Sequence, residues 1–230
     1  LEVLLQAAKN FEIDIWKINR KLLVQLLFTG QDVTERIALL RDYIRAGGSP
    51  ELEEAFLYRC AYANVILKQP IHRYMVQMIL RLCRWGAKVS RLCKIAALQY
   101  YAKNKGLLEE KNRGQAAKIV RELFEENCLL PVLQQFADLV PEVWEILDKT
   151  FVVYEGEPEK QLVLNYRRVE GERAEAQYHE MELPCVCDGI YAAGFILFPG
   201  ERLQYYITVS EKPEIILENG MLLAQEEATE

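Results

Sequence analysis

Apolar positions in the first two thirds of the chain follow the period of an α-helix. They recur every three or four residues up to about residue 147, in stretches separated by short turn signals. Gly47-Gly48 ends one such stretch, and Ser49 followed by Pro50 is typical of a helix start. Asn112, with Gln115 three residues later, is a second candidate N-cap. We therefore predict helices near residues 1–9, 12–29, 33–46, 50–68, 71–86, 89–104, 113–128, 131–138 and 141–148.

The predicted helices repeat in pairs. The starts at residues 12 and 50 are 38 positions apart, and those at residues 50 and 89 are 39 apart. Tyr62-Ala63 is echoed 39 positions later by Tyr101-Ala102. A helix pair of roughly 40 residues is the repeating unit of α-solenoids such as tetratricopeptide (TPR) and HEAT arrays. We predict a solenoid-like repeat array, with a plain helical bundle as the alternative.

At Lys149 the period of the apolar positions changes from helical to the two-residue alternation of strands. Short alternating segments follow, with turn signals such as Pro199-Gly200 and Asn219-Gly220 between them. This pattern favours an immunoglobulin-like β-sandwich. The predicted class is α+β in two segregated parts: a helical repeat domain over residues 1–148, a sandwich domain over 149–223 and an acidic tail over 224–230.

Strand alternation also predicts which aromatic side chains are exposed. Tyr205 shares a face with Ile207 and is expected inside, whereas Tyr206 points to the opposite face. An exposed tyrosine can contact a sugar ring, so Tyr206 makes a carbohydrate-binding module one alternative function. The competing explanation is that these tyrosines fill the core or the domain interface. We expect Trp144 and Leu147, beside the boundary, to be covered at that interface.

Two parts of the sequence carry a resemblance to a known family. The first is Arg91–Tyr101 (RLCKIAALQYY) followed by Glu109-Glu110-Lys111, and the second is Gly189-Ile190-Tyr191 with Leu197–Ile207 (LFPGERLQYYI). Over about residues 50–220 the chain resembles the C-terminal region of a large clostridial-type bacterial family of unknown function. The resemblance implies a bacterial source and helical repeats followed by an immunoglobulin-like sandwich. It implies no activity.

The composition is that of an ordinary globular protein, with 51% apolar and 27% charged residues. No apolar run reaches the roughly 18–20 residues that span a bilayer. The six cysteines include no Cys-x-x-Cys pair and only two histidines occur, so we predict no metal and no other cofactor. We expect buried free thiols rather than disulfides and hence a cytoplasmic location, with the cell surface left open. Because the sequence starts at Leu1 without methionine, we expect a piece of a longer protein.

The sequence contains no recognisable catalytic set. His179-Glu180 lacks the second histidine of a zinc-protease motif, with Leu183 in its place, and His72 stands alone. None of the three serines lies in a Gly-x-Ser-x-Gly segment, and no glycine-rich phosphate loop follows a strand. We therefore predict that this chain is not an enzyme, while the activity of any remainder of the protein stays open.

A long segment without acidic residues is the most distinctive feature. Ala55 to Leu108 contains no Asp or Glu but ten basic residues. Like charges three or four residues apart on a helix repel by a few tenths of a kcal/mol per pair, so an anionic partner that offsets this repulsion is one hypothesis. The candidate surface for such a partner consists of Arg73, Arg81, Arg84, Lys88, Arg91 and Lys94.

The distribution of charge along the chain indicates which anionic partners to consider. Residues 1–148 carry 21 Lys+Arg against 18 Asp+Glu, a net of +3, whereas residues 149–230 carry 7 against 16, a net of −9. The acidic sandwich or another part of the same protein is the first explanation, and an acidic protein partner the second. Nucleic acid or an anionic membrane surface is third, and the sequence pI of about 5.3 is low for a nucleic-acid binder. We predict a non-enzymatic protein-interaction or scaffold module, with an anionic-partner binder and a carbohydrate-binding module as alternatives.

Overall fold

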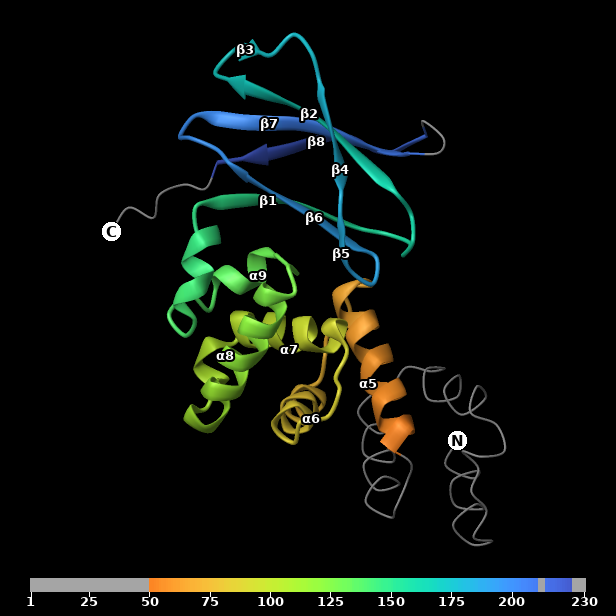
Figure 1. The fold of residues 1–230 in the computed structure, drawn as a ribbon, viewed down its shortest axis with the longest axis vertical. Coiled ribbons are helices and arrows are strands. Elements are labelled where there is room, and N and C mark those ends of the chain that lie inside the picture. Colours follow the sequence, from red (N-terminus) through yellow and green to blue (C-terminus); the bar gives the residue numbers. More distant parts are fainter. Residues whose placement is uncertain (1–49, 211–213, 225–230) are drawn as a thin grey trace, which may run out of the picture.

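The computed structural model describes residues 50–210 and 214–224, with helices first and strands after them (Figure 1). The longer helices of this part are α5 (Pro50–Val65), α6 (Arg73–Arg84), α7 (Arg91–Lys103) and α8 (Glu110–Glu125). Three short helices complete it: η1 (Lys105–Leu107), α9 (Pro131–Gln134) and η2 (Pro141–Ile146). The helices predicted at 1–9, 12–29 and 33–46 lie outside the described residues.

The strands form two antiparallel sheets. They are β1 (Lys149–Glu155), β2 (Leu162–Glu170), β3 (Arg173–Ala174), β4 (His179–Leu183), β5 (Cys185–Cys187), β6 (Ile190–Ile196), β7 (Glu201–Val209) and β8 (Ile215–Leu223). The three-stranded sheet has the order β1-β6-β5. The five-stranded sheet has the order β3-β2-β7-β8, and β4 pairs with β2 beside β3. The predicted α+β class with a sandwich-like C-terminal part is therefore confirmed.

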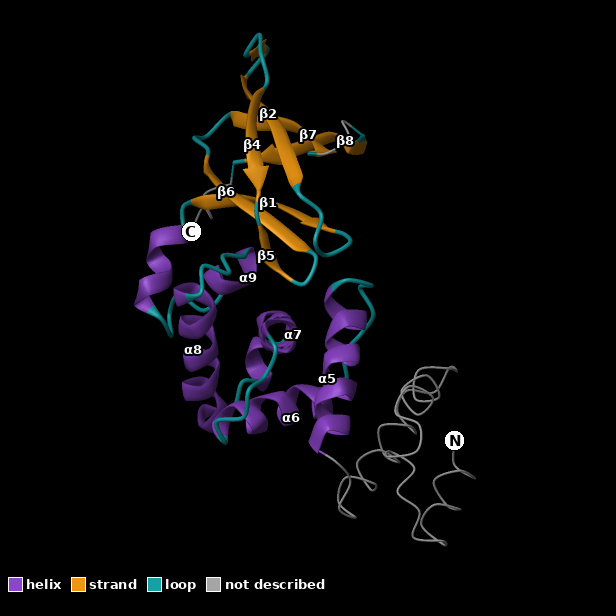
Figure 2. Cartoon of the chain, turned by 45° about the vertical axis from the view of Figure 1, so that its right-hand side comes forward, coloured by secondary structure: helices purple, strands orange, loops and turns teal. Residues whose placement is uncertain are grey.

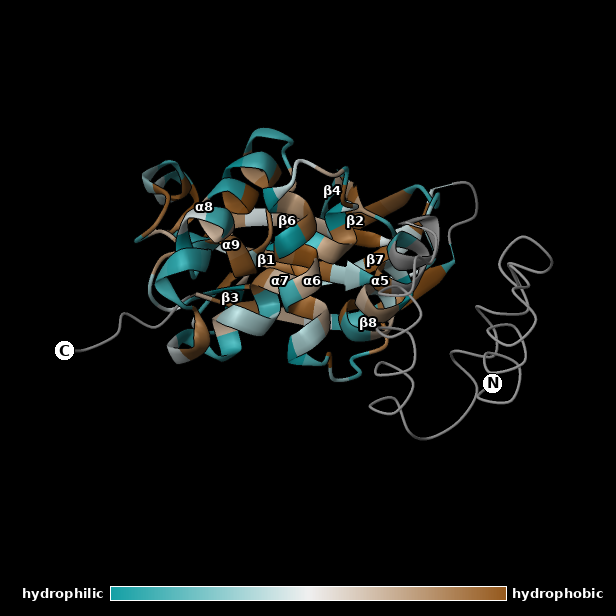
Figure 3. Cartoon of the chain, turned by 90° about the horizontal axis from the view of Figure 1, so that it is seen from below, coloured by the Kyte–Doolittle hydropathy of each residue, from teal (hydrophilic) through white to brown (hydrophobic). Residues whose placement is uncertain are grey.

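Two cores hold three layers together. In the first, residues of α7 such as Ile95 and Leu98 share one apolar cluster with Phe151 of β1 and Ile190 of β6. In the second, the opposite faces of β1 and β6 meet the five-stranded sheet, with Val152 among the buried residues. The three-stranded sheet thus lies between the helices and the larger sheet (Figure 2). Seen from the helical end, α6 and α7 lie in front of the strands (Figure 3).

Side-chain caps define two helix starts, and a third differs from the prediction. His72 Nδ1 accepts a hydrogen bond from Tyr74 N at 3.2 Å at the start of α6, and Ser90 Oγ accepts one from Cys93 N at 3.3 Å at the start of α7. The expected cap at Asn112 is wrong, because α8 already begins at Glu110. Asn112 is buried instead, and its Oδ1 accepts a hydrogen bond from Arg84 Nη2 at 3.2 Å.

The joint between helices and strands is built from other residues than expected. Trp144 and Leu147 are exposed, with 63% and 39% of their surfaces accessible, so their predicted cover is wrong. The buried residues here are Val140, Val143 and Ile146. The 3₁₀ helix η2 has three residues per turn, so positions three apart share the inward face.

The turn predicted at Asn219-Gly220 is also wrong, because β8 continues through both residues to Leu223. The register against β7 shifts between Tyr205 and Ile207, which is an irregularity of the β-bulge kind. Asn219 has a φ of 55°, a left-handed conformation that asparagine tolerates better than most residues. The same residue types that favour a turn therefore produce a bulge inside a paired strand.

Candidate functional site

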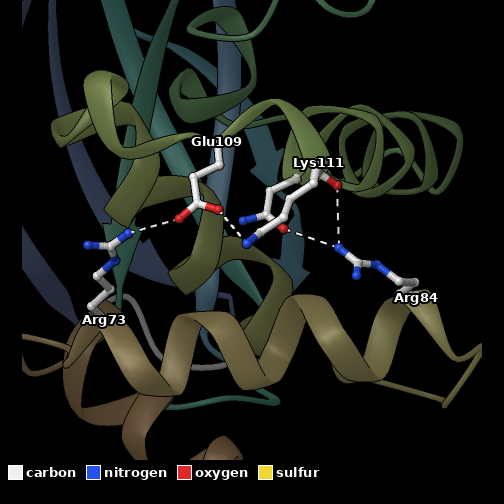
Figure 4. A network of polar contacts seen from close by, with 5 residues as sticks. Arg73, Arg84, Glu109 and Lys111 are labelled. Atoms are coloured by element: carbon white, nitrogen blue, oxygen red, sulfur yellow. Dashed lines mark hydrogen bonds and ion pairs between the residues drawn. The ribbon is translucent and has the colours of Figure 1, made fainter.

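Three of the basic residues singled out in the sequence pair with acids in α8 or beside its ends. Arg73 pairs with Glu109 at 3.2 Å, Lys94 with Glu122 at 2.7 Å, and Arg91 with Glu126. Arg84 donates from Nη2 to the carbonyl oxygen of Lys111 at 3.3 Å as well as to Asn112. Figure 4 shows Glu109 between Arg73 and Lys111. Arg84 lies at the other end of α6 from Arg73.

Arg81 and Lys88 complete the set of six predicted residues. The guanidinium of Arg81 is 5.0 Å from the centre of the Trp85 ring, a cation–π distance. Lys88 is exposed in the connection between α6 and α7. The six predicted residues thus lie along α6, in its connection to α7 and at the start of α7, and their role as one surface stays a prediction.

The charges of this network stabilise each other. The hydrogen bond with Glu126 raises the pKa of Arg91, and the hydrogen bond with Lys111 lowers the pKa of the Glu109 carboxyl. These acids lie in α8 or directly beside its two ends, while the strands contribute Glu155, which pairs with Lys68. The repulsion that motivated the anionic-partner hypothesis is thus offset within the chain, and that hypothesis stays a prediction.

A pocket of about 690 Å³ lies where the end of α5, the end of α7 and the start of α9 meet. We call it the amide pocket, because five of its lining side chains are amides: Asn64, Gln69, Gln99, Asn104 and Gln135. The lining also includes Tyr100, Lys68 and Lys103 but no carboxylate. Most of the residues that line this pocket come from the acid-free segment, residues 55–108, so the lining has no negative side chain.

Two of the five amide side chains bond to the backbone that forms the pocket, and three make no hydrogen bond within the described chain. Asn64 Nδ2 donates to the carbonyl oxygen of Gln69 at 2.7 Å, and Asn104 Nδ2 donates to that of Tyr100 at 2.8 Å. Each of these hydrogen bonds stabilises the backbone at the C-terminal end of a helix, α5 for Asn64 and α7 for Asn104. The side chains of Gln69, Gln99 and Gln135 make no hydrogen bond to the part of the chain that the structure describes. These three amides can therefore pair with a ligand.

A second concave surface, of about 500 Å³, lies on the five-stranded sheet and contains Tyr206. We call it the sheet groove. The rings of Tyr178 and Tyr206 meet edge to face with centres 5.1 Å apart, and the guanidinium of Arg167 is 4.9 Å from the centre of the Tyr178 ring. Arg167 Nε donates to Gln204 Oε1 at 3.0 Å. Tyr205 packs against the sandwich core but is half-buried and also lines the groove, and burial raises the pKa of its hydroxyl.

The six cysteines are free thiols, and four are buried. Burial raises the pKa of Cys83, Cys93 and Cys128 to about 11 and that of the half-buried Cys60 to about 12. Because the thiolate is the reactive form, these thiols are poor nucleophiles. Within residues 50–210 and 214–224 no three His, Cys, Asp or Glu side chains are grouped to hold a metal ion. In the same ranges no helix is long and apolar enough to cross a membrane.

Residues 1–230 match the profile of a family described as "Family of unknown function (DUF5717)C-terminal". The chain belongs to the DUF5717 C-terminal family. The match covers the whole chain, a longer range than the resemblance at residues 50–220. No curated protein and no solved structure matches it. The function of this DUF5717 region must therefore be argued from its own surfaces.

Sequence reasoning missed most of both concave surfaces. It selected Tyr206 but neither Tyr178 nor Arg167, because a bend between β3 and β4 places Tyr178 beside Tyr206. It did not select the glutamines of the amide pocket, because isolated glutamines carry no spacing signal. The available signal was the acid-free segment, which was interpreted as a helix surface rather than a pocket wall.

Proposed function

We propose that this chain is a non-enzymatic protein-interaction module that binds an extended, uncharged peptide segment of a partner in the amide pocket. The helices would form a short solenoid-like array and the strands an immunoglobulin-like sandwich. In support of the array, α5 and α7, which carry the echoed Tyr-Ala pairs, pack against each other. The buried free thiols support the cytoplasm as its place of action.

The observation that carries this proposal is the set of three unpaired amides around one pocket. A primary amide offers both a donor and an acceptor, so it matches the alternating N–H and C=O groups of an extended peptide. Gln99 is half-buried, and its amide makes no hydrogen bond to the part of the chain that the structure describes. Filling the pocket with a polar backbone would satisfy it. Tyr100, Pro131 and Val132 add apolar contacts for side chains of the segment.

The charge balance of the pocket favours an uncharged segment. The ends of α5 and α7 both border it, and the free carbonyl groups of a helix end carry partial negative charge. Lys68 Nζ donates to the carbonyl oxygen of Val65 at 2.8 Å, and Lys103 is in the last turn of α7. These two cations complement the helix ends, so little positive charge remains for an acidic ligand.

The test is a selection of peptides from a random displayed library on the 230-residue chain, followed by fluorescence anisotropy with the selected peptides. Gln99→Leu removes the amide at similar volume. We expect this substitution to lower the affinity for the selected peptides about tenfold, because one unmade hydrogen bond costs about 1–3 kcal/mol. Gln77→Leu is the matched control, because Gln77 is an exposed glutamine of α6 outside the pocket lining.

One result supports the proposal and three contradict it. Equal affinity in Gln77→Leu and wild type, with weaker binding in Gln99→Leu, supports the amide pocket. Binding that Gln99→Leu leaves unchanged would place the peptides elsewhere and contradict it, as would a library that yields no binder. Affinity that falls steeply with added salt would contradict the uncharged segment and favour an anionic partner.

A further inference from the structure

The sheet groove has a composition that the peptide-binding proposal does not use. Its aromatic side chains are Tyr178, Tyr205 and Tyr206, and Tyr178 is 39% exposed although it is a large ring. Its polar side chains all end in planar groups: the guanidinium of Arg167, the amides of Gln204 and Asn219, and the carboxylate of Glu218. Rings and planar polar groups therefore share one open surface.

The groove is held in place by contacts within the sheet. Arg167 is fixed between the Tyr178 ring and Gln204, which leaves the Nη groups of the guanidinium and the Nε2 group of Gln204 as donors. The Tyr205 ring lies close above the backbone of β8, because a Cβ added at Gly220 would come within 2.4 Å of its ring carbons. Gly220 thus allows the two strands to approach where the groove is lined by Tyr205.

We propose that the sheet groove binds a neutral oligosaccharide. A pyranose ring presents C–H groups on its flat face and hydroxyl groups around its edge. The C–H groups pack on the faces of aromatic rings, and each pair of neighbouring hydroxyls matches a planar side chain that offers two atoms at once. Tyr178 and Tyr206 supply the first contact, and Arg167, Gln204, Glu218 and Asn219 the second.

The charge of the groove specifies a neutral sugar. Arg167 and Glu218 contribute one positive and one negative charge to the lining, so neither an acidic nor a basic sugar gains a net attraction. Shallow aromatic sites gain modest energy per contact, and we expect dissociation constants in the range of about 10⁻⁵ to 10⁻³ M. Binding should change little between low and high salt, in contrast to an anionic partner held by surface cations.

The experiment is isothermal titration calorimetry of the 230-residue chain with five neutral probes: cellohexaose, xylohexaose, mannohexaose, maltohexaose and chitohexaose. We expect at least one to bind, and both Tyr206→Ala and Arg167→Ala to weaken it at least tenfold. Tyr206→Phe keeps the ring and should retain most of the affinity. Trp85→Ala is the control, because Trp85 is a 69% exposed aromatic residue of the helical part, outside the groove.

The variants' far-UV circular dichroism and melting temperatures establish that they fold. Failure of all five probes to bind overturns the proposal. Binding that survives Tyr206→Ala, or that Trp85→Ala abolishes, overturns it as well, because the sugar would then lie elsewhere. The amide pocket is on the other side of the three-stranded sheet from this groove. The result of the peptide assay therefore does not depend on the result of the sugar assay.

Discussion

At the residue scale, one glycine allows the backbone to pack closely where the end of β1 meets the start of β6. Gly189 precedes β6 with a φ of 85°, and its carbonyl oxygen accepts a hydrogen bond from Gly156 N at 2.9 Å. A Cβ at this position would lie 2.3 Å from the carbonyl oxygen of Gly156, a backbone atom that cannot rotate away. Two requirements for glycine, a left-handed conformation and a close backbone approach, thus coincide at Gly189.

Replacement of Gly189 by alanine should lower the free energy of unfolding by about 3 kcal/mol. The left-handed backbone accounts for about 1–2 kcal/mol and the overpacking for a similar amount. Gly171→Ala is the matched control, because Gly171 has a φ of 57° with open space around it, and it should lose only about 1 kcal/mol. Urea denaturation measures both losses. Equal losses in the two variants would show that the approach of Gly156 adds nothing.

At the scale of elements, the buried residues of α8 follow the helical period. Ala116, Ile119, Val120 and Leu123 are all buried, at the three- and four-residue steps of an amphipathic helix. The period does not give the start of the helix. Glu109 is the N-cap without a side-chain hydrogen bond, and Asn112 is drawn inward by Arg84. A hydrogen-bond partner on another helix therefore overrides the local preference for a cap.

Gly114 lies inside α8 with no neighbouring atom near a would-be Cβ. Gly114→Ala should therefore raise the free energy of unfolding by about 0.5–1 kcal/mol, since alanine loses less backbone entropy than glycine on forming a helix. The melting temperature and the urea midpoint should both rise. A destabilised Gly114→Ala variant would contradict the open space that the structure assigns to this position.

At the scale of the whole molecule, the helices and the three-stranded sheet share a core. Phe151 of β1 is 8% exposed and belongs to the cluster that contains the helix residues Ile95 and Leu98. Gln134 Nε2 also donates to the carbonyl oxygens of Ile146 and Lys149, which ties α9 to the start of β1. The two parts predicted from the charge and period change are thus in contact through apolar side chains, and their boundary at residue 148 stays a prediction.

Phe151→Ala should destabilise helices and strands together. A buried Phe→Ala substitution costs about 3–5 kcal/mol, and here the lost contacts lie between the two parts. Hydrogen exchange should show similar losses of protection in α7 and β6. Val153→Ala is the control on the same strand, because Val153 is 37% exposed, and it should cost well under 1 kcal/mol. Loss of protection confined to the helices would show that the sandwich folds independently.

The sequence alone determined what depends on local periodicity. It determined the order of helices and strands, the change near Lys149 and the absence of acids from residues 55–108. These follow from patterns that each segment carries by itself. Only the tertiary structure decided which acids meet those cations, that Asn112 is buried, and which residues form the amide pocket and the sheet groove. The physical reason is that each of these depends on contacts between residues distant in sequence, and no local pattern encodes which distant side chain will lie opposite.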